Sequence, residues 1–157
     1  MTVSEPTDEQ RLEAAGIDVN QLAPGWDLVD VEINGTVQAE IVWDEGTIMA
    51  SLAPAAYDDC IAGYVCYFEN TNYGGRVLQF SAIGLVSSMA TYSFNDQMSS
   101  WRSRRSLDAR WYYDTGGSGT SRCVESISSN ADVGAGVFNA DNDEMSSARI
   151  YDNDNVC

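Results

Sequence analysis

Hydrophobic and polar positions in the first 25 residues fit one short helix. Thr7 and Gln10 have the spacing of a capping box, and the segment DEQRLEAAG (8–16) ends at a glycine that can stop a helix. Pro24-Gly25 then favours a turn. The pattern predicts a helix within residues 8–16, followed by a reversal of the chain.

The next two apolar runs alternate with the period of β-strands. WDLVDVEI (26–33) and TVQAEIVW (36–43) flank Asn34-Gly35, and Asn-Gly between alternating runs is a strong hairpin signal. Because a two-stranded hairpin is marginal alone, we expect it to pack on the rest of the chain or on a neighbouring copy. The segment MASLAPAAYDD (49–59) is expected to be a linker.

From Cys60 onward the helical period disappears, and short β-prone runs alternate with clusters of Gly, Asn, Asp and Ser. Strands at this spacing are typical of an antiparallel sandwich. We therefore predict an all-β fold, with residues 1–57 as an N-terminal extension and residues 58–157 as the main domain. The expected strands are GYVCYFE (63–69), GRVLQFS (75–81), RWYYD (110–114), SRCVESI (121–127) and SARIYD (147–152).

The main domain contains an internal repeat. Six of the eight positions in NDQMSSWR (95–102) recur identically in NDEMSSAR (142–149). An aromatic residue and a later glycine precede each copy at the same spacing, in Tyr67…Gly74 and in Tyr112…Gly119. The repeat predicts two halves, about 60–105 and about 106–155, which pack together because neither half can bury both faces of its sheet.

The net charge and the absence of histidine limit the classes of function that the protein can have. The formal net charge is −16, so nucleic acid and anionic membranes are poor partners, whereas cations are natural ones. The chain has no His, which removes the usual general base and the commonest transition-metal ligand. Catalysis by carboxylates alone stays possible in principle, but nothing places two of them convincingly. We expect that the protein is not an enzyme.

The four cysteines favour disulfides over a zinc site, because their number is even and no Cys-x-x-Cys occurs. Three connectivities are possible, and we favour Cys60–Cys66 with Cys123–Cys157 because the first pair is close in sequence. Disulfides indicate a secreted, extracellular protein, with a reduced cytosolic protein as the alternative. No apolar stretch is long enough for a transmembrane helix. The start, MTVSEPTDEQ, is no secretory signal, so we expect an exported protein to have lost its leader from this sequence.

The two hairpins and the two Asn-Asp segments resemble the microbial βγ-crystallin superfamily. Its Greek-key unit has an aromatic-x6-Gly hairpin, and its calcium motif is Asn/Asp-Asn/Asp-x-x-Ser/Thr-Ser, which NDQMSS (95–100) and NDEMSS (142–147) match at every fixed position. The resemblance covers about residues 60–152. It implies a double Greek-key sandwich that is preceded here by the helix and the hairpin.

The resemblance also implies two Ca²⁺ ions bound jointly by the two motifs. Asn, Asp and Ser supply the oxygens that this hard cation prefers. Each site would take the third-position carbonyl and the fifth-position hydroxyl of one motif, an acidic or amide side chain of the other motif, and a carbonyl of a hairpin loop. The alternative is that both segments are ordinary polar turns. The implied ligands are Asn95, Asp96, Gln97 and Ser99, then Asn142, Asp143, Glu144 and Ser146, with Asn70 and Thr115 as the loop carbonyls.

A second resemblance suggests a different function on the same fold. CIAGYVCYFENTNYGG (60–75) is similar to the start of the secreted actinobacterial metalloproteinase inhibitors. The resemblance implies a rigid loop that enters a protease cleft, for which Cys123 and Val124 are the candidates. Family members brace this loop with a local disulfide, whereas Cys123 has no cysteine within ten residues. The expected partners are thus calcium and an extracellular protease, for a monomer or a homodimer through the N-terminal hairpin.

Overall fold

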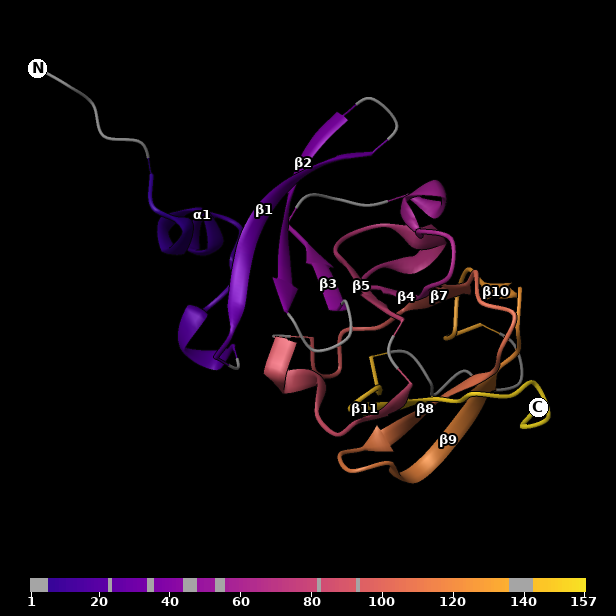
Figure 1. The fold of residues 1–157 in the computed structure, drawn as a ribbon. Coiled ribbons are helices and arrows are strands. Elements are labelled where there is room, and N and C mark those ends of the chain that lie inside the picture. Colours follow the sequence, from indigo (N-terminus) through magenta and orange to yellow (C-terminus); the bar gives the residue numbers. More distant parts are fainter. Residues whose placement is uncertain are drawn as a thin grey trace, which may run out of the picture.

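The computed structural model of this protein describes residues 6–22, 24–33, 36–43, 48–52, 56–81, 83–92, 94–135 and 143–157. Two antiparallel sheets face each other, and a helix lies beside the far edge of the larger one (Figure 1). Seven strands form sheet A, in the order β1-β2-β3-β5-β4-β7-β10. Four strands form sheet B, in the order β6-β11-β8-β9. The predicted all-β fold is confirmed.

The elements have the following bounds. The α-helix is α1 (Asp8–Ala14), and the short 3₁₀ turns are η1 (Val19–Gln21), η2 (Tyr57–Asp59), η3 (Thr71–Tyr73) and η4 (Met89–Tyr92). The strands are β1 (Trp26–Ile33), β2 (Thr36–Trp43), β3 (Ile48–Ser51), β4 (Val65–Phe68), β5 (Val77–Phe80), β6 (Gly84–Val86), β7 (Ser100–Ser103), β8 (Ala109–Asp114), β9 (Ser118–Val124), β10 (Ser129–Asn130) and β11 (Ser147–Ile150).

The two repeats form two interlocked Greek keys. The first repeat supplies β4 to β7 and the second supplies β8 to β11, but each repeat sends its third strand into the sheet of the other. Strand β6 pairs with β11 in sheet B, and β10 pairs with β7 in sheet A. The halves therefore share both sheets, which explains why neither half is a complete unit by itself.

The main core lies between the sheets and continues under the N-terminal helical segment through Leu12, Ile17 and Leu22. Met98 and Met145, the matching methionines of the two motifs, are both completely buried in it, as are Trp111 and Tyr67. Their unbranched side chains suit this position because they fill irregular space between packed aromatic rings. The motif segments are thus fixed to the core at equivalent points.

The N-terminal extension is built into sheet A. Thr7 and Gln10 form the predicted capping box of α1, and β1 pairs with β2 as expected, up to Ile33 opposite Thr36. Beyond β2, strand β3 pairs with β2 on one side and with β5 on the other. The expected linker is therefore wrong at residues 49–51, which belong to a strand buried on both faces. Such a short strand carries no alternating pattern.

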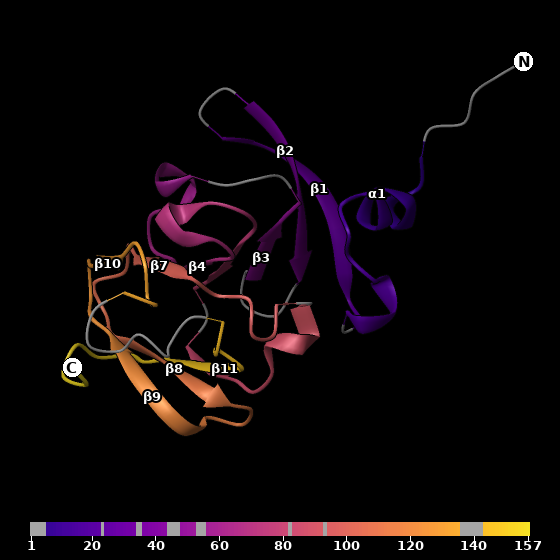
Figure 2. The same cartoon turned by 180° about the vertical axis from the view of Figure 1, so that it is seen from behind.

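The outer edge of sheet A is β1, and α1 lies next to it, away from sheet B (Figure 2). A hydrogen-bonded ion pair of 3.0 Å joins Arg11 of the helix to Asp30 of β1. Asp27, Asp30 and Glu32 make this edge acidic and exposed. Like charges on an edge strand oppose pairing with another copy of the same strand. A homodimer through the hairpin stays a prediction that must overcome this repulsion.

Residues 56–64, which we call the strap, lie on the outer face of sheet A over β4, β5 and β7. The Cys60–Cys66 disulfide ties it to β4, and the Arg102 guanidinium lies 3.6 Å from the centre of the Tyr57 ring. Arg102 also donates a hydrogen bond of 2.7 Å to the Tyr57 carbonyl. These contacts fix the strap on the first Greek key.

We predict that Met98→Ala lowers the free energy of unfolding by about 2–5 kcal/mol, because a buried methionine loses its contacts and leaves a cavity. Ile83→Ala is the control, since Ile83 is exposed and its truncation costs little. Urea unfolding at a fixed calcium concentration measures both. Equal losses for the two variants would contradict the core position of Met98.

Candidate metal centre

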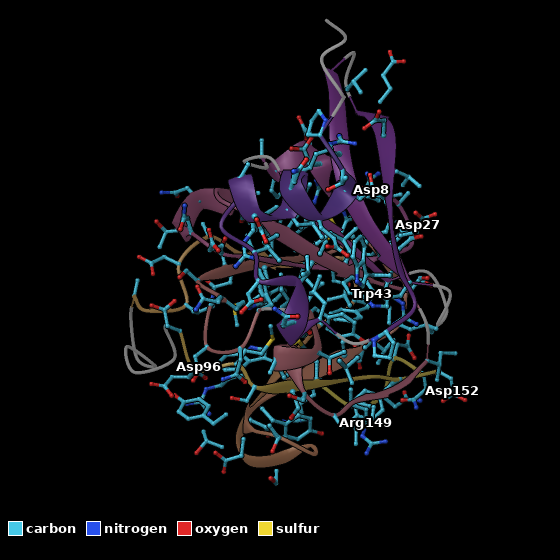
Figure 3. All side chains as sticks on the ribbon, turned by 90° about the vertical axis from the view of Figure 1, so that its left-hand side faces the viewer. Asp8, Asp27, Trp43, Asp96, Arg149 and Asp152 are labelled. Carbon is cyan, nitrogen blue, oxygen red and sulfur yellow. A yellow bond between two sulfur atoms is a disulfide. The ribbon has the colours of Figure 1, made fainter. Side chains whose placement is uncertain are left out.

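The two Asn-Asp segments lie side by side, and each hydroxyl meets the carboxylate of the other motif. Ser99 Oγ donates to Asp143 Oδ1 at 3.1 Å, and Ser146 Oγ donates to Asp96 Oδ1 at 3.0 Å. Both serines are nearly buried, whereas both aspartates are exposed. Figure 3 shows Asp96 at the surface of the molecule. The repeat therefore produces two crossed serine–aspartate pairs, each open to solvent on its carboxylate side.

The backbone repeats the same crossing. The Asp96 N–H donates to the Met145 carbonyl at 2.9 Å, and the Asp143 N–H donates to the Met98 carbonyl at 3.0 Å. Both aspartates adopt left-handed backbone conformations, with φ of 56° and 59°. Asp and Asn tolerate this region better than other residues with a side chain. Asp is therefore suited to the second motif position both by its charge and by its tolerance of the left-handed backbone conformation.

The final serine of each motif holds the neighbouring hairpin. Ser100 Oγ donates to the Asn70 carbonyl at 2.7 Å and accepts a hydrogen bond of 3.1 Å from the Tyr73 N–H. In the second repeat, Ser147 Oγ donates to the Asp114 carbonyl and accepts from the Gly117 N–H at 3.0 Å. These serines organise the loops around the crossed pairs.

The hairpin glycines correct the spacing predicted for the first repeat. Gly75, with φ of 72°, approaches Asn70 just as Gly119, with φ of 78°, approaches Asp114. A β-carbon on Gly75 would lie 2.9 Å from Asn70 Nδ2, and one on Gly119 would lie 2.8 Å from Asp114 Cγ. The aromatic-x6-Gly unit of the first half is therefore Phe68…Gly75. The predicted Tyr67…Gly74 is displaced by one residue, because adjacent aromatics and adjacent glycines left the register ambiguous.

The match between the two hairpins also corrects the pair of loop carbonyls predicted as calcium ligands. Asn70 corresponds to Asp114 in the second half, so Asn70 and Thr115 are not matching positions. The Thr115 carbonyl accepts a hydrogen bond of 2.8 Å from Ser118 Oγ. Asn142 lies outside the described residues. Asn95, Gln97 and Glu144 flank the crossed pairs along the chain, and their role as ligands stays a prediction.

The donor set suits a hard cation. Two oxygens that ligate one Ca²⁺ at ~2.4 Å lie roughly 3 Å apart, which is the separation within each crossed pair. In the part of the chain that the structure describes, no group of three or more His, Cys, Asp or Glu side chains is placed to hold a metal. An ion here would therefore need hydroxyls, carbonyls and water beside one carboxylate, as Ca²⁺ accepts.

The candidate inhibitory residues lie in a strand. Cys123 and Val124 end β9, where Cys123 forms a disulfide with Cys157 and Val124 is 0% exposed. Val124 therefore cannot present its side chain to a partner. The exposed apolar side chain is that of Ile127 in the next turn, with 69% exposure and φ of 49°. The predicted strand SRCVESI (121–127) is therefore too long by three residues, since β9 ends at Val124 and Ile127 is left-handed, a conformation that β-branched residues rarely adopt.

Comparison with solved structures shows the fold. One structure, from work on the evolution of the eye-lens βγ-crystallin domain fold, matches with a TM-score of 0.54 and 21% identity, covering 66% of this chain and 95% of that chain. The chain has the βγ-crystallin fold. Other βγ-crystallin matches include one from Ciona intestinalis (27% identity, 56% of this chain and 99% of that chain, TM-score 0.48) and a domain from Clostridium beijerinckii (26%, 56% and 97%, TM-score 0.47).

Residues 53–124 of this βγ-crystallin fold match the model of peptidase inhibitor family I36. The matched part covers the strap, the first Greek key and the first two strands of the second. A search of the curated proteins found no match. The two disulfides are the pairs expected from the sequence and are consistent with an extracellular protein. Among the described residues, no helix is long and apolar enough to span a membrane.

We predict that Gly119→Ala costs more stability than Gly116→Ala. Both glycines have positive φ, but a β-carbon meets Asp114 only at Gly119 and meets nothing within 4 Å at Gly116. The backbone cost of about 1 kcal/mol is common to both variants, and the clash adds to it only at Gly119. Thermal unfolding measures the difference. A larger loss for Gly116→Ala would contradict the assigned role of Gly119.

Proposed function

We propose that this protein is a calcium-binding βγ-crystallin whose two ions stabilise the interlocked Greek keys. The observation that supports the proposal most directly is the pair of crossed serine–aspartate contacts. Each contact brings an uncharged hydroxyl oxygen against a carboxylate oxygen of the other repeat, at the spacing of two ligands of one ion. An ordinary polar turn would not need the other repeat.

One site would contain the Gln97 carbonyl, Ser99 Oγ and the Asp143 carboxylate. The other would contain the Glu144 carbonyl, Ser146 Oγ and the Asp96 carboxylate. Asn95, Asn142 and the hairpin loops near Asn70 and Thr115 would supply further oxygens, and water would complete the six to eight ligands that Ca²⁺ takes. Each ion would then contact both repeats, so that separating the repeats would break both sites.

The expected stabilisation is large. At millimolar calcium and a dissociation constant of ~10 µM, binding to the folded state contributes about 2.7 kcal/mol per site. A typical domain has only ~5–15 kcal/mol in total. Calcium also offsets carboxylate repulsion in a chain with a net charge of −16. The proposed role is therefore durability outside the cell.

The crossed arrangement predicts which substitutions act on the same site. Ser99→Ala and Asp143→Asn should each weaken the first site by at least ~10-fold, and Ser146→Ala and Asp96→Asn should do the same for the second. The double variant Ser99→Ala/Asp143→Asn should then keep one intact site. The double variant Ser99→Ala/Asp96→Asn should weaken both sites, although it removes the same two chemical groups.

Calorimetric titration of calcium into chelator-treated protein measures affinity and stoichiometry. Trp101, which follows the first motif, offers a fluorescence readout of the same event. Asp152→Asn in the C-terminal tail is the charge-matched control and should bind two ions as the parent does. Indistinguishable double variants would contradict the crossed sites, and absence of heat from the parent would contradict calcium binding.

A second candidate function is peptidase inhibition. The match to family I36 over residues 53–124 supports it, and so does the turn of residues 125–128. An inhibitor needs a rigid, exposed contact element, because rigidity lowers the entropic cost of binding. Ile127 is a large apolar side chain at the tip of this turn, held in a conformation that a β-branched residue seldom adopts.

The turn is fixed on several sides. Ile127 N–H donates to the Arg105 carbonyl at 3.0 Å, and Ser128 Oγ donates to the Glu125 carbonyl at 2.6 Å. Asp108 lies beneath the turn and accepts from the Ser126 N–H at 3.1 Å. Burial alone would raise the pKa of Asp108, but backbone N–H groups of Cys157, Val156 and Ser126 hold this pKa below its ordinary value. The Asp108 carboxylate and the Cys123–Cys157 disulfide thus replace the local disulfide of the similar inhibitors.

If this turn contacts a peptidase, Ile127→Ala should weaken inhibition by at least ~10-fold without changing the melting temperature. Val37→Ala is the control, because Val37 is equally exposed but lies on strand β2 of the extension. Metallo-, serine and cysteine peptidases are assayed with each variant at micromolar inhibitor. No slowing of any peptidase by the parent would remove this candidate, and equal effects of the two variants would move the contact elsewhere.

A further inference from the structure

Glu40 is a buried carboxyl group that takes no part in the candidate metal centre or in the turn of residues 125–128. It lies on β2 of the N-terminal extension and is 0% exposed. Neither of its carboxylate oxygens has a hydrogen-bond partner among the described residues. A buried, unpartnered carboxylate is strongly unfavourable when ionised, so this group favours its neutral form.

The register of the strands shows what surrounds Glu40. It pairs with Val29 on β1 and with Ser51 on β3. Its neighbour Ile41 belongs to the core and Ala39 packs against it, so Glu40 faces the opposite, outer side of sheet A, where Asp59 of the strap is near enough to act on its charge. Gln79 lies on the same face of β5, where its side chain donates to the Asp59 carbonyl at 3.1 Å. The strap's own Asp59 side chain accepts from the Ala56 N–H at 2.7 Å. Glu40 thus sits where the extension, the strap and the first Greek key meet.

The charges near this junction do not compensate Glu40. Strand β1 contributes exposed Asp27 to the same face, the strands β3 and β5 place Ser51 and Gln79 there, and the strap contributes Asp58 and Asp59. Among the described residues, no basic side chain pairs with the Glu40 carboxylate. Arg102 lies on β7, four strands away from β2, and it binds the Tyr57 carbonyl of the strap, whereas Arg104 donates to the Cys60 carbonyl at 2.9 Å. Burial, reinforced by repulsion from Asp59, raises the pKa of Glu40 to about 7.

We propose that Glu40 is a proton-operated lock that holds the N-terminal extension and the strap on the Greek keys. The neutral acid fits the buried junction, and loss of its proton places an unpaired charge beneath the strap. When the strap and the extension open, water solvates the Glu40 carboxylate, and the free-energy cost of burying its charge is removed. Opening also uncovers the edge of β5, which β3 covers in the closed form. This proposal concerns the extension and does not depend on calcium binding.

The direction of the pH dependence follows from linkage. The pKa of Glu40 is raised in the closed state relative to its ordinary 4.5, so the open state loses the proton first as pH rises. The closed form is therefore most stable below pH ~4.5 and weakens progressively up to pH ~7. Between pH 5 and pH 8, the opening equilibrium constant should increase on the order of 70-fold.

Hydrogen exchange on the full chain, corrected for the intrinsic rate and run in saturating calcium, tests the lock. Protection of the β1, β2 and β3 amides should fall by at least ~10-fold from pH 5 to pH 8, while β8 and β11 amides keep theirs. Glu40→Gln, a neutral isostere, should abolish this difference. Glu32→Gln, an exposed position on β1 of the same hairpin, should retain it.

A carboxyl-carbon NMR titration of the parent gives a readout that does not depend on any variant folding. The Glu40 resonance should titrate with a midpoint near 7. A midpoint below ~5 would overturn the proposal, as would the same pH dependence in Glu40→Gln as in the parent. Amide protection that does not change with pH but increases with sodium or calcium concentration would also overturn it, because a bound cation would then neutralise the Glu40 carboxylate.

Discussion

The crossing of the two Asn-Asp segments is the constraint on which the rest of the main domain depends. Each segment lends a hydroxyl, a carboxylate, an N–H and a carbonyl to its counterpart, so neither segment has its native surroundings until both repeats are present. The buried methionine between the aspartate and the serine of each motif ties this surface network to the core. The third-strand exchange has the same consequence at the level of the sheets. We therefore expect the two halves to fold as one cooperative unit, so that whatever stabilises the crossing stabilises the whole domain.

Much of the fold was predictable because local chemistry carried it. The capping box at Thr7, the Asn-Gly turn between two alternating runs, and the repeated motif each specify a local structure by themselves. The parts that were missed depend on distant partners. Strand β3 has only four residues, all of them buried, and it pairs with β2, which precedes it, and with β5, which follows it. Strands β6 and β10 are shorter still, and each exists because the opposite repeat provides its partner.

The candidate site shows the same division. The motif predicted the serines and aspartates that the structure brings together. It could not show that Gly75 rather than Gly74 closes the first hairpin, since two adjacent glycines give no register. Nor could it show that Val124 is buried and Ile127 exposed, because the strand ends through a left-handed residue that no local preference favours. Glu40 was equally hidden, as an acidic residue in an alternating strand normally faces water.

The central claim is that each crossed serine–aspartate pair is half of a calcium site shared by the two repeats. A crystal structure of the protein grown with abundant Ca²⁺, with anomalous scattering measured to locate the ions, tests this most directly. We expect two anomalous peaks, one within ~2.6 Å of Ser99 Oγ and the Asp143 carboxylate, and one equally close to Ser146 Oγ and the Asp96 carboxylate. Water alone at both places, with the serine–aspartate hydrogen bonds intact, would contradict the account.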